Sequence, residues 1–232
     1  TGVDLRLNTR ATVDGLAEDF DAVVLATGVS PRKITIPGIE HEKVLSYLDV
    51  LKHNKPVGQR VALIGAGGIG FDVAEFLANE GENADPIDAY LSEWGVDRDL
   101  TERGGLCDAA PPTPAREIFL CQRSSGKHGA DLGKTTGWIH RSSLKKRGVT
   151  MLAGCSYDKI DDDGLHITID GERRLLSVDT VVICAGQVSK RDLETGLKER
   201  GVRVHIIGGA DQATELDARL AFDQGTRLGA SF

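Results

Sequence analysis

The residues with the clearest chemical potential are the glycines between positions 65 and 70. Gly65, Gly67 and Gly70 have the spacing G-x-G-x-x-G. In this pattern the first glycine permits a tight turn, the second lets a diphosphate approach the backbone, and the third allows a helix to pack closely on a strand. Gly68 lies in the same turn and belongs to the same candidate site. The pattern predicts a dinucleotide site, and the alternative is a turn whose glycines serve packing alone.

A second group of polar residues follows the strand that we expect at 117–122. Arg123, Ser124 and Lys127 lie in the sequence QRSSGKH, where units that bind NAD usually carry a carboxylate for the ribose 2′-hydroxyl. A carboxylate would repel a phosphate, whereas a guanidinium, a hydroxyl and an ammonium can bind one. The sequence therefore predicts NADP(H). The alternative is that these basic residues are merely solvated, and we expect His128 to be an exposed loop residue.

A strand and a helix must hold the glycine turn in place. The apolar run 61–64 has the length and composition of a buried parallel strand. After the glycines, apolar residues recur at helical spacing at Phe71, Ala74, Leu77 and Ala78. The glycines therefore fall at the start of a helix, where free N–H groups and a partial positive charge favour phosphate.

The remaining pattern predicts an α/β protein. The expected elements are an edge strand at 3–13, buried strands at 20–30, 149–155, 180–186 and 201–209, a hairpin of 157–160 with 165–169, a strand at 173–178, and helices at 44–52, 133–147 and 216–228. Leu216 and Leu220 are expected one turn apart on the apolar face of the last helix. The sequence TVVICAG at 180–186 repeats the pattern of VVLATG at 23–28, which indicates two domains of related design.

Two segments have less certain roles. Residues 82–116 interrupt the nucleotide unit, and we expect a surface insertion that buries one apolar face, formed by Tyr90, Leu91, Trp94, Val96 and Leu100. The sequence at 136–138, Thr-Gly-Trp, could place hydrogen-bond donors and a flat ring near a cofactor. A packing role at the start of a helix is equally compatible with it.

The composition argues against several classes of partner. The formal net charge of −7 and the lack of a dense Lys/Arg run argue against a nucleic-acid surface. No apolar run approaches the ~20 residues that span a bilayer, and residues 1–10 do not form a signal peptide. The four cysteines form no C-x-x-C pair, and the acidic turn at 161–163 lacks the further oxygen ligands of a Ca²⁺ loop. We therefore expect no metal site, no membrane contact, and a cytoplasmic protein with reduced thiols, three of them buried at Cys121, Cys155 and Cys184.

The order of motifs resembles a known family. Along the chain the sequence reads A-T-G, G-x-G-x-x-G, Q-R-S-S-G-K, C-A-G and G-G-A-D. This order is similar to that of the C-terminal half of the bacterial NADPH-dependent 2,4-dienoyl-CoA reductases, in the old-yellow-enzyme and trimethylamine-dehydrogenase group. The resemblance covers nearly the whole chain and is most specific in LGKTTGWIHR at 132–141, YDKIDDDGLH at 157–166, and the sequence from 208 to 229.

The resemblance implies a division of labour between two domains. It implies a Rossmann-like, glutathione-reductase-type NADPH-binding domain at 53–180, inserted in an incomplete FAD-binding α/β domain at 1–52 and 181–232. In this family NADPH reduces FAD, and electrons continue to FMN through a 4Fe-4S cluster in an N-terminal barrel. The barrel is missing here, as is the glycine-rich unit that begins the FAD domain. The chain is therefore expected to be a fragment that binds NADP(H) and holds FAD poorly.

The family's cofactor contacts can be carried over to matching positions. Gly65, Gly67 and Gly70 would hold the NADPH diphosphate, and Arg123, Ser124 and Lys127 would bind its 2′-phosphate. Thr27, Gly28 and Asp211 would contact FAD, although Asp211 could equally be an N-cap without a ligand. No residue is assigned as an acid or base, because hydride transfer between two cofactors depends mainly on their orientation.

Two other functions remain open. The chain could be a non-redox scaffold that holds ADP, as in some relatives of trimethylamine dehydrogenase, but a 2′-phosphate site would be useless to ADP. It could also belong to another flavin oxidoreductase, of the glutamate-synthase or thioredoxin-reductase type. The latter normally carries a C-x-x-C pair, which this sequence lacks.

Overall fold

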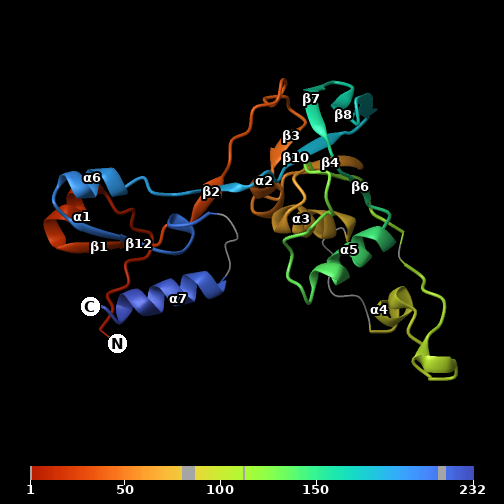
Figure 1. Ribbon diagram of the computed structural model, residues 1–232, viewed down its shortest axis with the longest axis horizontal. Coiled ribbons are helices and arrows are strands. Elements are labelled where there is room, and N and C mark those ends of the chain that lie inside the picture. The colour runs from red at the N-terminus through yellow and green to blue at the C-terminus, as the bar shows by residue number, and fades with distance from the viewer. Residues whose placement is uncertain (1, 80–86, 112, 214–217) are drawn as a thin grey trace. The chain divides into compact units, whose positions relative to one another are not determined.

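The chain folds into two compact units. The computed structural model describes residues 2–79, 87–111, 113–213 and 218–232 (Figure 1). Unit 1 comprises Thr1–Arg32 with Gly186–Phe232, and unit 2 comprises Lys33–Ala185. Both boundaries lie outside the 53–180 range expected for the inserted domain. The reason is that the strand at 44–46 pairs with the strand at 180–183, which makes the segment before residue 53 part of the sheet of unit 2.

Unit 2 is built on a parallel sheet of five strands. Their order across the sheet is β3 (Val44–Ser46), β10 (Thr180–Ile183), β4 (Arg60–Ile64), β5 (Glu117–Cys121) and β6 (Thr150–Leu152). All four pairings are parallel, and Ile64 at the end of β4 lies between Ile183 and Cys121. The expected α/β fold with a Rossmann-like parallel sheet is therefore confirmed.

The two faces of this sheet are covered by different layers. Val61 and Leu63 of β4 face a core shared with α2 (Tyr47–Leu51), α3 (Gly68–Ala78) and α5 (Gly137–Lys146). Ala62 and Ile64 face the opposite core, beneath an antiparallel sheet of β7 (Ser156–Asp161), β8 (Gly164–Ile169) and β9 (Glu172–Leu176). In Figure 1 the helices and the small sheet lie on opposite sides of the parallel sheet. This alternation explains why β4 is apolar at successive positions.

Unit 1 contains two pairs of strands and three α-helices within the described residues. β1 (Ala22–Leu25) pairs in parallel with β12 (Arg203–Ile206), and β2 (Val29–Pro31) pairs antiparallel with β11 (Gln187–Ser189). The helices are α1 (Val13–Asp19), α6 (Glu194–Glu199) and α7 (Ala218–Gly229), and a 3₁₀ turn, η2, spans Gly208–Ala210. The small core contains Val23, Leu25, Leu197 and Val202.

The expected edge strand at 3–13 is wrong. Residues 3–12 form no strand, and the side chains of Val3, Leu5 and Leu7 are 71–79% exposed. Val13 already belongs to α1, which begins after Thr12, whose hydroxyl accepts a hydrogen bond from the amide of Gly15. In the last helix, Leu220 lies in α7, whereas Leu216 lies outside the described residues.

The insertion contains a helix but buries less of its surface than expected. Within residues 87–111 it forms α4 (Ile87–Trp94), a 3₁₀ turn η1 (Arg103–Gly105), and a bridge between Val96 and Leu106; residues 82–86 and 112 lie outside the description. Tyr90, Val96 and Leu100 are 54%, 37% and 76% exposed, so the predicted buried face is wrong for these three residues. Glu93, which is 3% exposed, contacts Arg147 of the rest of unit 2.

Among the described residues, no helix combines the length and the apolar character that a bilayer crossing requires.

Candidate functional site

The glycine turn joins β4 to α3 at the carboxyl end of the parallel sheet. Gly65 has a φ of +113°, and a Cβ there would lie 2.5 Å from the carbonyl oxygen of Cys184. A Cβ on Gly70 would lie 1.9 Å from the carbonyl oxygen of Gly65. These two glycines are therefore required by the fold itself, for the turn and for the close approach of α3 to β4.

The other two glycines of the turn face open space. A Cβ on Gly67 or Gly68 would have no heavy atom within 4 Å. Gly67 is the N-cap of α3 and has no side chain to accept from the helix, so the first N–H groups lack the usual capping oxygen. The surface that they present fits an anionic group that approaches the helix N-terminus.

The loop after β5 lies next to this turn. The amide of Gly65 donates to the carbonyl oxygen of Cys121 at 2.9 Å, so the ends of β4 and β5 are neighbours. Arg123, Ser124 and Lys127 are all exposed in this loop. Several other basic residues form ion pairs, but among the described residues none is found for Arg123 or Lys127. The loop therefore offers two unneutralised cations beside the open glycines.

Two buried residues that sequence reasoning did not assign hold this loop in shape. Gln122 is 9% exposed, and its side-chain nitrogen donates to the carbonyl oxygens of Ser124 at 3.0 Å and Gly126 at 2.6 Å. His128 is 8% exposed and its Nε2 lies 3.1 Å from the carbonyl oxygen of Leu152. The prediction that His128 is an exposed residue is therefore wrong. The signal that could have identified both is their polarity next to a buried strand, where an unpaired polar group is costly.

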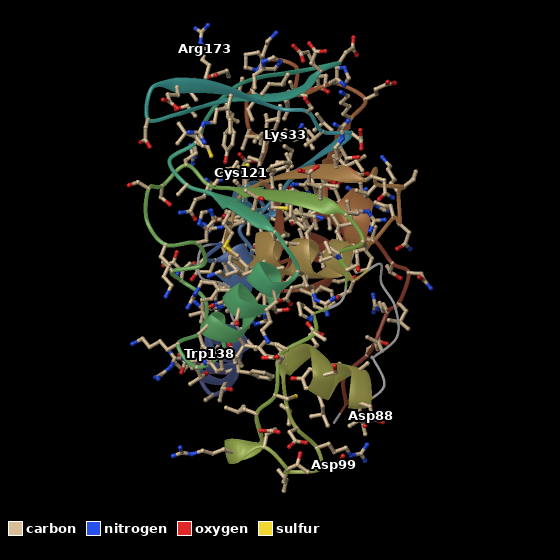
Figure 2. All side chains as sticks on the ribbon, turned by 90° about the vertical axis from the view of Figure 1, so that its right-hand side faces the viewer. Lys33, Asp88, Asp99, Cys121, Trp138 and Arg173 are labelled. Atoms are coloured by element: carbon tan, nitrogen blue, oxygen red, sulfur yellow. The ribbon has the colours of Figure 1, made fainter. Side chains whose placement is uncertain are left out.

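In the segment at 136–138, Gly137 has a packing role at the start of α5. Gly137 is buried, and a Cβ there would lie 2.8 Å from the Cβ of Leu132. Trp138 is 58% exposed, and Figure 2 shows it at the surface near the start of α5.

In unit 1 the three residues carried over as FAD contacts come together at the carboxyl ends of β1 and β12. The Thr27 hydroxyl donates to the carbonyl oxygen of Lys190, whose own amide donates to the carbonyl oxygen of Gly28 at 3.0 Å. Gly28 has a φ of +72°, and a Cβ there would meet nothing within 4 Å. A Cβ on Gly209 would lie 3.2 Å from Gly28, which places η2 against this turn.

Asp211 follows η2 and is held by two neighbours. Gln224 of α7 donates to its Oδ2 at 2.8 Å, and the Arg191 guanidinium lies 3.7 Å from its Oδ1. Its side chain is 44% exposed. Asp211 is therefore oriented by its neighbours but still accessible at the same end of unit 1 as Thr27 and Gly28.

The acidic turn between β7 and β8 brings three potential ligands together. One ligand atom each from Asp161, Asp163 and His166 lies within 4.8 Å of the others. Hydrogen bonds from Lys159 and His166 hold the pKa of Asp161 below its ordinary value. These internal partners already stabilise the carboxylate, and the expectation of no metal at this turn stays a prediction.

The fold and the glycine turn define a dinucleotide-binding domain of an oxidoreductase. A family model described as pyridine nucleotide-disulphide oxidoreductase matches residues 3–210. The chain belongs to this family, whose fold binds FAD and NAD(P).

Individual relatives match almost the whole chain but extend far beyond it. The chain is 27% identical to a metal reductase of Desulforamulus reducens over 216 residues, which are 90% of this chain and 31% of that protein. It is also 27% identical to a cinnamate reductase of Clostridium sporogenes, covering 93% of this chain and 27% of the relative. A solved 2-naphthoyl-CoA reductase superposes with a TM-score of 0.76 at 23% identity, covering 100% of this chain and 30% of that one. The chain therefore spans less than a third of the length of these three proteins.

Proposed function

We propose that the chain is the electron-input part of an NADPH-dependent 2,4-dienoyl-CoA reductase. In this proposal unit 2 binds NADPH and unit 1 contributes part of the FAD site, and the two bound cofactors would supply the hydride-transfer chemistry. The parent protein acts in the β-oxidation of unsaturated fatty acids in the cytoplasm. An N-terminal barrel outside this sequence carries FMN, a 4Fe-4S cluster and the acyl-CoA site. Relatives named as reductases, one of them acting on an acyl-CoA, support this class of parent.

The observation that carries the proposal is the pairing of an open helix N-terminus with a cationic loop. Gly67 and Gly68 leave room for a diphosphate against the first amides of α3. On the adjacent strand end, Arg123 and Lys127 offer charge without a carboxylate partner in the described residues. A 2′-phosphate supplies the negative charge that such a loop lacks, whereas a free ribose hydroxyl does not.

Three residues of unit 1 are suited to contact the flavin cofactor. The backbone at Gly28 leaves space for a ligand to approach, since no side chain stands there. The carboxylate of Asp211, oriented by Arg191 and Gln224, can accept hydrogen bonds from hydroxyl groups. Thr27 lies in the same turn. In the parent these groups orient FAD, and none of them needs to move a proton.

Titration calorimetry with NADPH, NADH and ADP tests the proposal. Each charge-assisted hydrogen bond to the 2′-phosphate contributes about 1.5–3 kcal/mol, so we expect NADPH to bind at least ~10-fold more tightly than NADH or ADP. Arg123→Leu should weaken NADPH binding and leave NADH binding unchanged. Arg103→Leu, an exposed arginine in the insertion, is the matched control and should bind both nucleotides as the parent sequence does.

Equal affinity for NADPH and ADP would overturn this assignment. The chain would then be a scaffold that holds ADP in a trimethylamine-dehydrogenase-like flavoprotein, and the exposed cations of the loop after β5 would be solvated residues without a ligand.

A further inference from the structure

A small cleft lies at the amino end of the parallel sheet of unit 2. Its volume is about 180 Å³. β4 and β5 begin at Arg60 and Glu117, directly after the cleft, whereas the glycine turn follows the other end of β4. The cleft is therefore separate from the proposed NADPH site. Its lining comes from α2 and the segment after it, from the last turns of α3, and from the residue before β5: Val50, Asn54, Lys55, Pro56, Val57, Phe76, Leu77 and Arg116.

Much of the lining of this cleft is apolar. Val50 and Leu77 are each 2% exposed and belong to the core on the helical face of the sheet, so packing fixes their positions. The side chain of Phe76, by contrast, is 40% exposed. An apolar group that covers this ring removes it from water, which is favourable. Since a cavity of about 150 Å³ with apolar walls accommodates benzene, the volume of the cleft suits a single ring or a short chain.

The cleft also contains a guanidinium that its protein neighbours satisfy only in part. The Nη1 of Arg116 donates to the carbonyl oxygen of Leu77 at 2.9 Å. Its Nε is buried without a hydrogen-bond acceptor, and no carboxylate of the described residues forms an ion pair with it. A buried donor without an acceptor is costly and often marks the place of a water, an ion or a ligand. The charge of Arg116 is thus available to an anion, which approaches the outer Nη groups because Nε is closed to solvent.

The second cation of the cleft, Lys55, already has a counter-charge. Its Nζ lies 2.7 Å from the Oδ1 of Asp49, and its amide donates to the carbonyl oxygen of Asp49 at 2.9 Å. The other carboxylate oxygen of Asp49 accepts from the amide of Ser46, which fixes the pair at the start of α2. Arg116 is therefore the one lining cation without a counter-charge in the described residues, and a single negative charge on a ligand balances it.

We propose that this cleft binds a small monocarboxylate with an apolar body, of the size of benzoate. The carboxylate accepts hydrogen bonds from the guanidinium of Arg116, a charge-assisted contact that is stronger than a neutral one. The apolar body lies against the ring of Phe76 and the buried side chains of Val50 and Leu77. A dianion such as inorganic phosphate lacks the apolar group and brings a second charge that no free cation of the lining balances. The site does not depend on the proposed function, since none of its residues belongs to the glycine turn or the loop after β5.

Titration of the ¹⁵N-labelled full chain with benzoate, followed by amide NMR spectra, tests the site without any substitution. The amide signals of Val57, Phe76 and Arg116 should shift until the site is saturated, and those of Gly67 and Gly68 should stay in place. Benzamide has the same ring without the charge, and inorganic phosphate has the charge without the ring. Each should bind at least ~10-fold more weakly than benzoate, because each lacks one of the two contacts.

Single variants separate the two contacts. Arg116→Leu should weaken benzoate binding at least ~10-fold. The matched control is Arg173→Leu, at an exposed arginine of β9 in the small antiparallel sheet, where Figure 2 labels it, and it should bind benzoate as the parent sequence does. Because Arg116 also bonds to the end of α3, Phe76→Ser provides a second variant at an exposed position, and it should weaken benzoate binding at least ~3-fold. Circular dichroism before each titration confirms that the variants are folded.

The proposal is overturned if benzoate causes no saturable shift, or if its shifts map to the glycine turn and the loop after β5. Equal binding of benzamide would refute the role of the charge, and equal binding of phosphate would refute the apolar contact. Repeating the titration with NADPH present keeps the two proposals distinguishable. The benzoate titration should be unchanged by NADPH, and a chain that binds benzoate at the cleft but fails to bind NADPH would contradict the proposed function alone.

Discussion

At the scale of single residues, the four glycines of the β4–α3 turn have two different physical roles. Gly65 and Gly70 are confined by carbonyl oxygens at 2.5 and 1.9 Å from their would-be Cβ atoms, whereas Gly67 and Gly68 adjoin open space. Spacing alone identifies the turn, and it identifies Gly70 as a packing glycine. Spacing cannot show which of the others would tolerate a methyl group, because that depends on the position of the neighbouring strand, β10.

Substitution of these glycines by alanine should separate the two roles. Gly70→Ala forces its Cβ into the carbonyl of Gly65 and should lower the free energy of unfolding by ~3 kcal/mol. Gly68→Ala adds a better helix former in open space and should change it by less than ~1 kcal/mol. Urea denaturation followed by far-ultraviolet circular dichroism measures both. Equal losses in the two variants would contradict the assignment.

Gln122 should control the shape of the loop beside the turn. In Gln122→Leu the carbonyl oxygens of Ser124 and Gly126 lose their donor, at a cost of about 1–3 kcal/mol, and the loop loosens. We expect weaker NADPH binding and a smaller preference for NADPH over NADH, measured by calorimetry. Gln59→Leu, at an exposed position before β4, is the control. An unchanged preference in Gln122→Leu would show that the loop does not depend on this residue.

At the scale of elements, a buried ion pair joins the described part of the insertion to the nucleotide unit. Glu93 of α4 and Arg147 after α5 lie 3.0 Å apart with side chains 5% and 10% exposed. Next to them, the ammonium of Lys146 lies 4.0 Å from the ring centre of Trp94. The sequence marked the insertion and its aromatic residues, but the charged anchor could not be predicted, because its two partners are far apart in the chain.

Removal of one partner of this pair should be costly. Glu93→Gln leaves the Arg147 guanidinium buried without its counter-charge and should lower the free energy of unfolding by ~3 kcal/mol. Asp88→Asn breaks the exposed pair of Asp88 with Arg98 and should cost less than ~1 kcal/mol. Urea denaturation monitored by tryptophan fluorescence compares the variants. A loss in Glu93→Gln no larger than in Asp88→Asn would refute the anchor.

The start of α2 should make stability depend on pH in acid. Hydrogen bonds from Lys55 and Ser46 hold the pKa of Asp49 below its ordinary value of 3.8. The stabilisation is therefore fully present above about pH 4 and is lost as the pH falls through the folded-state pKa. Asp49→Asn should lower the melting temperature at pH 7 but flatten its decline below pH 4. Calorimetric scans across this range, with Asp19→Asn at an exposed site as control, check the slope.

Elements differ in how well the sequence predicted them. β4, α3, β5 and the β7–β8 hairpin agree with their apolar spacing because their own residues fill a core on a known face. Residues 3–12 alternate as an edge strand would, yet alternation alone provides no neighbouring strand to pair with. The short helices α1 and α6 were missed, since seven and six residues give too few turns for a periodic signal.

At the scale of the whole molecule, the two units have very different cores. Unit 2 has a buried layer on each face of its sheet, whereas the core cluster of unit 1 contains four buried residues. We expect residues 33–185 expressed alone to fold cooperatively, with native-like circular dichroism and a single urea transition. The same measurement on residues 1–32 joined to 186–232 should show little cooperative unfolding. A disordered 33–185 fragment would show that its sheet depends on unit 1.

The division of the chain could be predicted only approximately, because the sequence does not reveal that β3 joins the sheet of unit 2 through β10. The similar sequence patterns at 23–28 and 180–186 indicated two related units, but they could not show at which residue one unit ends. That boundary depends on strand pairing across more than a hundred residues.

The pairing of β2 with β11 brings together the two points at which the chain leaves and re-enters unit 1. The amide of Arg32 donates to the carbonyl oxygen of Gly186 at 3.0 Å, so the chain leaves unit 1 and returns to it at adjacent points. Everything between them is, in topological terms, a very long loop of one hairpin. A single recombination event could therefore exchange unit 2 between genes, or replace it with a tight turn, without interrupting a strand of unit 1.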